Sequence, residues 1–127
     1  MSKDVNDILQ EGIYGVKEIN PAERRKFLGT LRERVLAVLS TTQVKESGTY
    51  KEIEELMAEH PKVKLILNGE LSYHHLSDYI KLANKHNLSF TISSNLEHET
   101  DIGLVLAYDY AIDQEDIYID TQQNSSG

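Results

Sequence analysis

Two adjacent histidines are the side chains in this sequence that most readily suggest metal chemistry. His74 and His75 are followed by Asp78, which lies four residues after His74 and would share its face of a helix. Imidazole and carboxylate groups are both ligands for zinc. Neighbouring side chains on a helix diverge by about 100°, however, so the two histidines cannot easily bind one ion. The sequence has no HExxH motif, and we predict a surface histidine pair and no metal site.

A second candidate for chemistry is an acidic loop that contains His98. Glu97, Glu99 and Asp101 surround this histidine, and such a loop could supply a general base or a ligand. A solvated loop explains the same residues, and we favour it. No serine lies in a GxSxG context, and the acids after Asp101 lack the glycine and the terminal glutamate of a calcium loop. We therefore predict no catalytic residue and no cofactor.

The chain has one short basic cluster that could bind phosphate or an acidic partner. Glu23 and Glu33 are interleaved with it, so a paired and solvated face is the favoured interpretation. RNA binding is the alternative, and we consider nucleic acid an unlikely partner because the patch is short. The acidic C-terminal third of the same or a neighbouring subunit would also fit. The cluster consists of Arg24, Arg25, Lys26, Arg32 and Arg34.

The elements that position these residues are organised around one stretch, from Val63 to Ser93. A short run of branched apolar residues stops at Asn68-Gly69, which indicates a buried strand. Apolar residues then recur at spacings of three and four, which predicts a helix that Ser72 caps and that ends at Asn87. A second strand follows at residues 90–92. Strand, helix and strand of these lengths predict a parallel pair with a crossover helix.

The segment before this unit has two interpretations. An Asn-Pro pair at Asn20 starts a helix, which we predict to end near Leu28. The following residues, from about Glu33 to Thr42, read as a buried strand with a polar exit. The alternative is a single helix that continues to Leu39. We predict the strand, because the downstream unit needs neighbouring strands.

The remaining elements complete a single α/β domain with a mixed sheet. Thr49 to Glu52 form a capping box that starts a helix. Strands are predicted at Gly103–Tyr110 and Asp116–Asp120. The first three strands are expected to be parallel and the last ones antiparallel at least in part. The predicted organisation of residues 1–127 is a helical arm (about 1–30), an α/β core (31–120) and a mobile polar tail (121–127).

Polar residues follow each of the three strands that are predicted to be parallel. Ligands of open α/β sheets bind beyond the carboxyl ends of such strands, and Gly69 would permit close approach of a ligand to the backbone. Loops and helix caps use the same residue types, so each triplet also has a purely structural interpretation. The candidate ligand-binding residues are Thr41, Thr42, Asn68, Gly69, Glu70, Ser93, Ser94, Asn95 and His98.

Composition limits the classes of protein that fit. The 127 residues carry a net charge of −8 and contain no cysteine, which excludes disulfides and thiolate chemistry. All 13 Lys and Arg residues lie in residues 1–93, where acids balance them, so the last third is acidic and disfavours broad binding to a phosphate backbone. No apolar run approaches the roughly 20 residues that span a bilayer, and the first residues do not resemble a signal peptide. We expect a cytoplasmic protein without membrane contact.

Several separated blocks of the sequence resemble the YueI-like family of small uncharacterised bacterial proteins. The blocks are GIYG, FLGTLRERVLAVLSTTQV, YIKLANKHNLSFTI and DIGLVLAYDYAID. The resemblance covers roughly residues 12–120 and implies a βαβαββ arrangement similar to the chorismate-mutase-like fold. It implies no activity, cofactor or catalytic residue, and kinship of fold is no argument for the chorismate mutase reaction.

The functional hypothesis from the sequence is a non-catalytic domain that binds a small ligand or a protein partner, as a possible homo-oligomer. One alternative is an enzyme that acts on a small polar substrate at the strand exits, with Glu70 or His98 in the reaction. The other is an RNA-associated protein that uses the cluster from Arg24 to Arg34.

Overall fold

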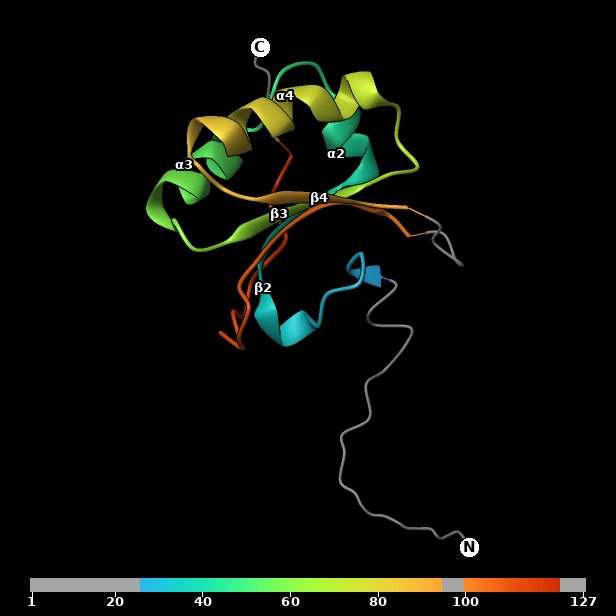
Figure 1. The fold of residues 1–127 in the computed structure, drawn as a ribbon. Helices are drawn as coiled ribbons and strands as arrows, with labels where there is room; N and C mark the ends of the chain where they lie inside the picture. Colours follow the sequence, from blue (N-terminus) through green and yellow to red (C-terminus); the bar gives the residue numbers. More distant parts are fainter. Residues whose placement is uncertain (1–25, 95–99, 122–127) are drawn as a thin grey trace, which may run out of the picture.

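The computed structural model describes residues 26–94 and 100–121, which form a four-stranded mixed sheet with helices on one face (Figure 1). The predicted α/β class with a mixed sheet is therefore confirmed. The strands are β2 (Val35–Ser40), β3 (Lys64–Asn68), β4 (Phe90–Ser93) and β5 (Ile102–Ala107). The helices are α2 (Thr41–Lys45), α3 (Lys51–Glu59) and α4 (Tyr73–Lys85), and a 3₁₀ turn, η1 (Arg32–Arg34), leads into β2.

The order of the strands in the sheet is β2-β5-β3-β4. β3 and β4 are parallel, whereas β5 runs antiparallel to both of its neighbours, β2 and β3. β2, β3 and β4 therefore share one direction, as predicted, but β2 and β3 are not neighbours because β5 lies between them. The carboxyl ends of these three strands consequently lie at one end of the sheet, together with the start of β5.

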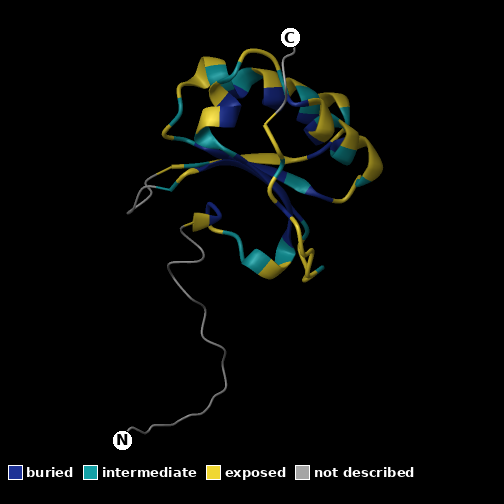
Figure 2. Ribbon diagram, turned by 180° about the vertical axis from the view of Figure 1, so that it is seen from behind, coloured by how far each residue is buried: buried dark blue, intermediate teal, exposed yellow. Residues whose placement is uncertain are grey.

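Both faces of the sheet are covered, and each has its own apolar cluster. Leu65, Leu67 and Leu104 pack with the three helices, while Ile66 and Val105 face the opposite side and pack with Phe27 and Ile117. This division follows from the alternation of side chains along a strand. Figure 2 shows the central strands in dark blue, with the exposed surface of the helices in yellow.

The β3–α4–β4 unit forms as the sequence predicts. Leu76, Tyr79, Ile80 and Ala83 give α4 a buried face at spacings of three and four residues. The helix ends before Asn87, whose φ of 59° is the left-handed conformation expected of a residue that stops a helix. Ser72 occupies the predicted cap position, but its side chain makes no capping hydrogen bond.

The contested segment is a strand, and the alternative of one long helix to Leu39 is wrong. Leu28 and Gly29 have φ angles of 57° and 92°, which no right-handed helix can contain. β2 then begins at Val35 and is buried along nearly its whole length. The strand ends at Ser40 rather than Thr42, because Ser40 and Gln43 form a capping box that starts α2. Residues 1–25, which make up most of the predicted helical arm, lie outside the described residues.

Two other local predictions are wrong. The capping box from Thr49 to Glu52 does not form: Tyr50 is the cap residue of α3, without a side-chain capping bond. The predicted final strand, Asp116–Asp120, is reduced to one bridge between Tyr118 and Val38 of β2. The strand predicted at residues 103–110 is shorter and is observed at 102–107, since the chain leaves the sheet after Ala107.

The C-terminal segment covers the outer edge of β2. The backbone N–H of Val38 donates to the carbonyl of Ile117 at 2.8 Å, and the side chain of Gln43 donates to the carbonyl of Ile119 at 2.7 Å. This segment therefore takes the place that another strand would occupy beside β2. Within residues 26–94 and 100–121, no strand pairs with the outer edge of β4.

Candidate functional site

The structure brings the three predicted strand exits together at one end of the sheet. Ser40 is paired with Ile102, and Asn68 is paired with Ser93. Their polar groups bind one another across this end: the N–H of Thr41 donates to the carbonyl of Asp101 at 2.7 Å. The predicted convergence of the exits is thus observed, and the next question is whether their polar groups are available to a ligand.

Asn68 is fully engaged within the fold. Its side chain is only 3% exposed. The amide nitrogen donates to the carbonyl of Ile102 at 3.1 Å, and the amide oxygen accepts from the N–H of Glu70 at 2.8 Å. A buried asparagine with both ends paired ties β3 to β5 and closes the turn after β3. The structure therefore gives Asn68 a structural role.

Gly69 is required by the close approach of two parts of the backbone. A Cβ atom at this position would lie 2.5 Å from the Oγ of Ser94 and 2.9 Å from the carbonyl oxygen of Ser93. The N–H of Gly69 donates to that same carbonyl at 2.8 Å. The glycine thus permits the packing of β4 against the turn, so the neighbouring strand accounts for it without a ligand.

The other residues of the predicted site are divided between surface and undescribed positions. Thr41 and Thr42 form the first turn of α2. Thr42, Glu70 and Ser94 are exposed, and Ser93 is half-buried. Asn95 and His98 lie outside the described residues.

A polar hollow lies in the helix layer, between the loop after α2 and the first two turns of α4. It has a volume of about 280 Å³, and its lining residues are Val44, Lys45, Glu46, Ser47, Gly48, His74, His75 and Asp78. α2 directly follows β2, and α4 follows the turn after β3. Both walls of the hollow are therefore close in sequence to the strand exits. The sequence analysis identified the histidines as candidates. It did not predict that the loop from Lys45 to Gly48 lies opposite them.

The carboxylates of this polar hollow already have partners. Glu46 accepts a hydrogen bond from the hydroxyl of Tyr50 at 2.8 Å, and Asp78 lies 3.9 Å from the ammonium of Lys81. In contrast, no hydrogen bond or ion pair of the Lys45 ammonium is found among residues 26–94 and 100–121. The cationic donor of the hollow is therefore less engaged than its acids.

The two imidazoles of the hollow lie against each other, with ring centroids 4.0 Å apart. Nδ1 of His74 is 3.0 Å from the hydroxyl of Ser72. Partial burial lowers the pKa of His75 below its ordinary value, and the nearby His74 and Lys45 lower it further. The lowered pKa favours the neutral form of the His75 imidazole at pH 7.

These groups do not assemble into a metal site. Across the described part of the chain, no group of three or more His, Asp or Glu residues could hold a metal ion.

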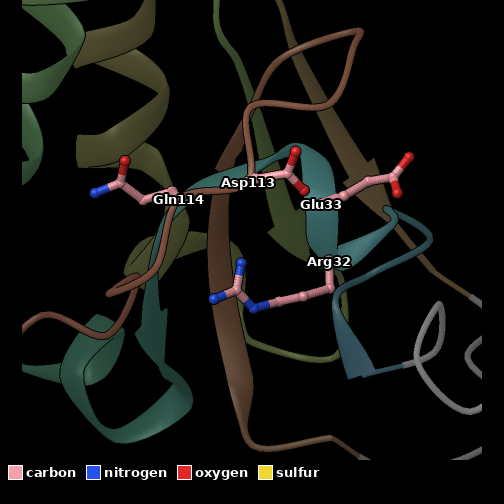
Figure 3. Close-up of a pocket in the computed structure, with 4 residues that line it drawn as sticks. All are labelled: Arg32, Glu33, Asp113 and Gln114. Atoms are coloured by element: carbon pink, nitrogen blue, oxygen red, sulfur yellow. The ribbon is translucent and has the colours of Figure 1, made fainter.

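A second hollow, of about 400 Å³, lies on the other side of the sheet, where Arg32 and Glu33 face Asp113 and Gln114. In Figure 3 the guanidinium of Arg32 and the carboxylate of Glu33 point in different directions. Arg32 donates to the carbonyl of Glu115 at 3.1 Å. The carbonyl of Glu33 accepts from the N–H groups of residues 112 and 113. This hollow is therefore a junction between η1 and the C-terminal segment.

The described members of the basic cluster contact the C-terminal segment of the same chain. The ammonium of Lys26 lies 5.9 Å from the ring centroid of Tyr118. Lys64 and, to a smaller extent, Arg34 lower the pKa of Asp109, which is 2.8 Å from the Lys64 ammonium. Arg24 and Arg25 lie outside the described residues. Lys26 and Arg32 thus contact an aromatic ring and a backbone carbonyl of the C-terminal segment, and pairing of the cluster with the acids of the C-terminal third stays a prediction.

None of the helices in the described ranges is both long and apolar enough to cross a membrane.

Comparison with known proteins identifies the family. Residues 2–118 match the family described as "Protein of unknown function (DUF1694)". The chain is 45% identical over 120 residues to the uncharacterized protein YueI of Bacillus subtilis (strain 168), an alignment that covers 94% of this chain and 91% of YueI. The crystal structure of YueI from Bacillus subtilis superposes with a TM-score of 0.77 over 84% of each chain, at 44% identity. The chain therefore belongs to the YueI-like family, whose function is unknown.

Proposed function

We propose that this protein is a non-catalytic domain that binds a small molecule carrying an anionic group in the polar hollow. The observation that carries the proposal is the imbalance of pairing in the hollow. Glu46 and Asp78 are paired with other residues, while the ammonium of Lys45 has no partner among the described residues. An ammonium that has no described partner, with a neutral imidazole beside it, suits a carboxylate or phosphate group.

The local field around His75 supports an anion. After partial burial, the neighbouring His74 and Lys45 lower its pKa, and neither carboxylate of the hollow is among the causes. A bound anion would oppose this shift, because it would favour protonation of the imidazole. The volume of about 280 Å³ lies just below the usual range of ligand pockets, so the ligand would be small.

The same geometry gives less support to catalysis. An acyl-transfer nucleophile needs a base within hydrogen-bonding reach. Within the described residues, no hydrogen bond joins Ser47 to either His74 or His75. Glu70 is exposed at the strand exits, and its backbone, not its carboxylate, is held by Asn68.

RNA binding through the basic cluster also has less support. Arg32 donates to Glu115, and Lys26 lies over the ring of Tyr118, so these cations are engaged by the C-terminal segment. An open phosphate-binding surface would need them free.

Thermal shift measurements with small anions test the proposal. Inorganic phosphate, succinate and citrate would each be titrated into the full chain at pH 6.0. We expect at least one of them to raise the melting temperature with saturation, and Lys45→Ala or His75→Ala to weaken that effect about tenfold, the result of losing one charge-assisted contact.

Lys62→Ala is the matched control, because it removes an exposed lysine that does not line the hollow. It should leave the midpoint of the titration unchanged. If the anion raised the melting temperature of all four proteins with the same titration midpoint, it would bind outside the hollow, and the proposal would be wrong.

A further inference from the structure

The outer edge of β4 is exposed and carries apolar side chains. Phe90 and Ile92 are each 39% exposed, although they are the two large apolar residues of the strand. Figure 2 shows this strand in yellow, beside the dark-blue strands of the sheet. Because β4 is last in the strand order, one of its sides has no neighbour among the described residues.

The backbone groups at this edge can be assigned from the pairing with β3. The N–H of Leu65 donates to the carbonyl of Ser89, and the N–H of Gly69 donates to the carbonyl of Ser93. Backbone groups alternate along a strand, so residues 89, 91 and 93 face β3. Phe90 and Ile92 therefore direct their N–H and C=O groups away from the sheet, and no hydrogen bond to either is found in the described ranges.

This edge lacks the usual protection against pairing. Sheet edges are commonly guarded by charged residues, proline or a bulge. The stretch from Ser89 to Ser94 contains no charge and no proline, and its register with β3 is regular. The opposite edge of the sheet is covered by the C-terminal segment at Val38. Among the described residues, the edge of β4 is therefore open to a partner strand, whereas the edge of β2 is covered.

We infer that this partner is a second copy of the chain, paired antiparallel through β4 about a twofold axis at Thr91. In this register Phe90 lies opposite Ile92 of the partner subunit, and Ile92 lies opposite the partner's Phe90. Each pair exchanges two hydrogen bonds, so all four outward N–H and C=O groups of each copy are satisfied. The result is one continuous sheet of eight strands.

The side chains match in the same register. Phe90 and Ile92 project on the face of the sheet that the helices cover, since they pair with Leu65 and Leu67, which belong to the cluster beneath the helices. Two aromatic–aliphatic pairs therefore form on one face, and Thr91 meets its own copy on the other. Such cross-strand pairs stabilise antiparallel strands.

Charge also favours self-association at this place. The chain carries −8, so two copies repel each other in general. A twofold axis places each residue near the axis beside the same residue of the partner subunit, so charged residues at such an edge would repel their own copies. The stretch from Ser89 to Ser94 is uncharged, so it can lie at the axis without electrostatic repulsion between the two copies. Because the edge is only four residues long, the dimer should be weak and dependent on concentration.

Analytical ultracentrifugation of the full chain over about 5–500 μM tests this inference. We expect the wild type to pass from monomer to dimer within this range. Ile92→Pro removes an outward N–H without disturbing a bond to β3, and it should raise the dissociation constant at least tenfold, because two hydrogen bonds are lost per dimer.

Ile92→Lys serves the same purpose if the proline variant fails to fold, and Tyr110→Lys is its control, because Tyr110 is an exposed aromatic residue outside the β4 edge. A monomer throughout the range, or a dimer that is unaffected by either change at Ile92, would overturn the inference.

The absence of cysteine allows a test of the register itself. In the proposed dimer the Cα atoms of the two Thr91 residues are about 4.5 Å apart, which is within the range for a disulfide. Thr91→Cys should therefore form a disulfide-linked dimer under mild oxidation. Phe90→Cys should not, because its own copy is two positions away. Equal rates of cross-linking in the two variants would contradict the proposed pairing.

Discussion

Asn68 shows why a polar side chain at a strand exit need not belong to a ligand site. From the sequence, Asn68-Gly69-Glu70 has the composition of a binding loop. In the structure, the amide of Asn68 bridges Ile102 and Glu70. The sequence shows that a hydrogen-bonding group follows the strand, but only the insertion of β5 shows which partner it meets. Residue types therefore predicted a polar turn correctly and did not predict its role.

The structural role of Asn68 leads to a prediction about Asn68→Asp. An ionised aspartate would face the carbonyl oxygen of Ile102 in a buried position, so the variant should lose about 3 kcal/mol of unfolding free energy at pH 7. The protonated acid can donate to that carbonyl, so the pKa of the aspartate is raised in the folded state, and the loss should diminish as the pH falls towards about 4, the ordinary value of an unfolded aspartate. Urea unfolding at pH 7.0 and 3.5 measures both effects.

Asn84→Asp is the control for this substitution, since Asn84 is exposed on α4. It should change the unfolding free energy by no more than about 0.5 kcal/mol at either pH. If Asn68→Asp behaved like Asn84→Asp, the structural assignment of Asn68 would be incorrect.

At the scale of elements, α3 and α4 are joined by a buried tyrosine. The backbone N–H of Tyr50, at the start of α3, donates to the hydroxyl of Tyr79 on α4 at 2.9 Å. Tyr79 is fully buried, and burial raises its pKa to about 12. This contact takes the place of the capping box that the sequence predicted at Thr49. Long-range contacts of this kind cannot be read from local spacing.

Tyr79→Phe should therefore destabilise the protein by about 1–2 kcal/mol, because the amide of Tyr50 loses this acceptor in a buried site. Tyr73→Phe makes the same chemical change on an exposed residue of the same helix, and its effect should be negligible. Thermal or urea unfolding of both variants provides the measurement. Equal stability of the two would mean that the buried hydroxyl contributes nothing.

Glu54 makes a second connection between these helices. Its carboxylate accepts from the ammonium of Lys85 at 2.7 Å and lies 3.0 Å from Nε2 of His86. The hydrogen bond from Lys85, followed by that from His86, lowers the pKa of Glu54 below its ordinary value of 4.5. The folded state thus favours the ionised carboxylate.

The sign of the resulting pH dependence follows from this shift. The contribution of Glu54 to stability is fully present above about pH 4.5 and is lost as the pH falls through the lowered pKa. Glu54→Gln should therefore be less stable than the wild type at pH 6, and the difference should shrink towards pH 3. Urea unfolding at intervals of 0.5 pH unit would reveal this. A difference that is constant with pH would show that ionisation of Glu54 is not involved.

Local patterns predicted the elements where one interpretation dominated. The β3–α4–β4 unit is correct because apolar spacing, the Asn68-Gly69 turn and the stop at Asn87 agree with one another. The strand at β2 is also correct, although its last two residues belong to α2. The capping box of Ser40 and Gln43 is the sequence feature that indicates α2. The apolar strand pattern led instead to a predicted strand that continues to Thr42. Asp116–Asp120 is not a strand, because it meets β2 at a single bridge.

At the scale of the whole molecule, the position of β5 decides what the strand exits can do. β5 enters the sheet between β2 and β3, and its first residue lies at their carboxyl ends. The backbone of β5 thereby pairs with polar groups at the strand exits, such as the side-chain amide of Asn68, that would otherwise be available to a ligand. Sequence reasoning gave the number and direction of the exits but not the order of the strands. The polar hollow between Lys45 and His75 likewise depends on tertiary packing, which brings together residues 30 positions apart. The predicted kinship with the chorismate-mutase-like fold stays a prediction.

The polar hollow is the centre of the functional proposal, and the titration of His75 tests it most directly. NMR detection of the His75 imidazole between pH 4.5 and 8.5 would give its pKa in the free protein and in 20 mM inorganic phosphate. We expect a pKa below 6.5 in the free protein, because partial burial, and after it His74 and Lys45, oppose protonation. Phosphate in the hollow should raise it by about half a unit or more, while His60 and His86, which do not line the hollow, should be unaffected. An unchanged pKa of His75, or equal changes at all three histidines, would contradict anion binding at this site.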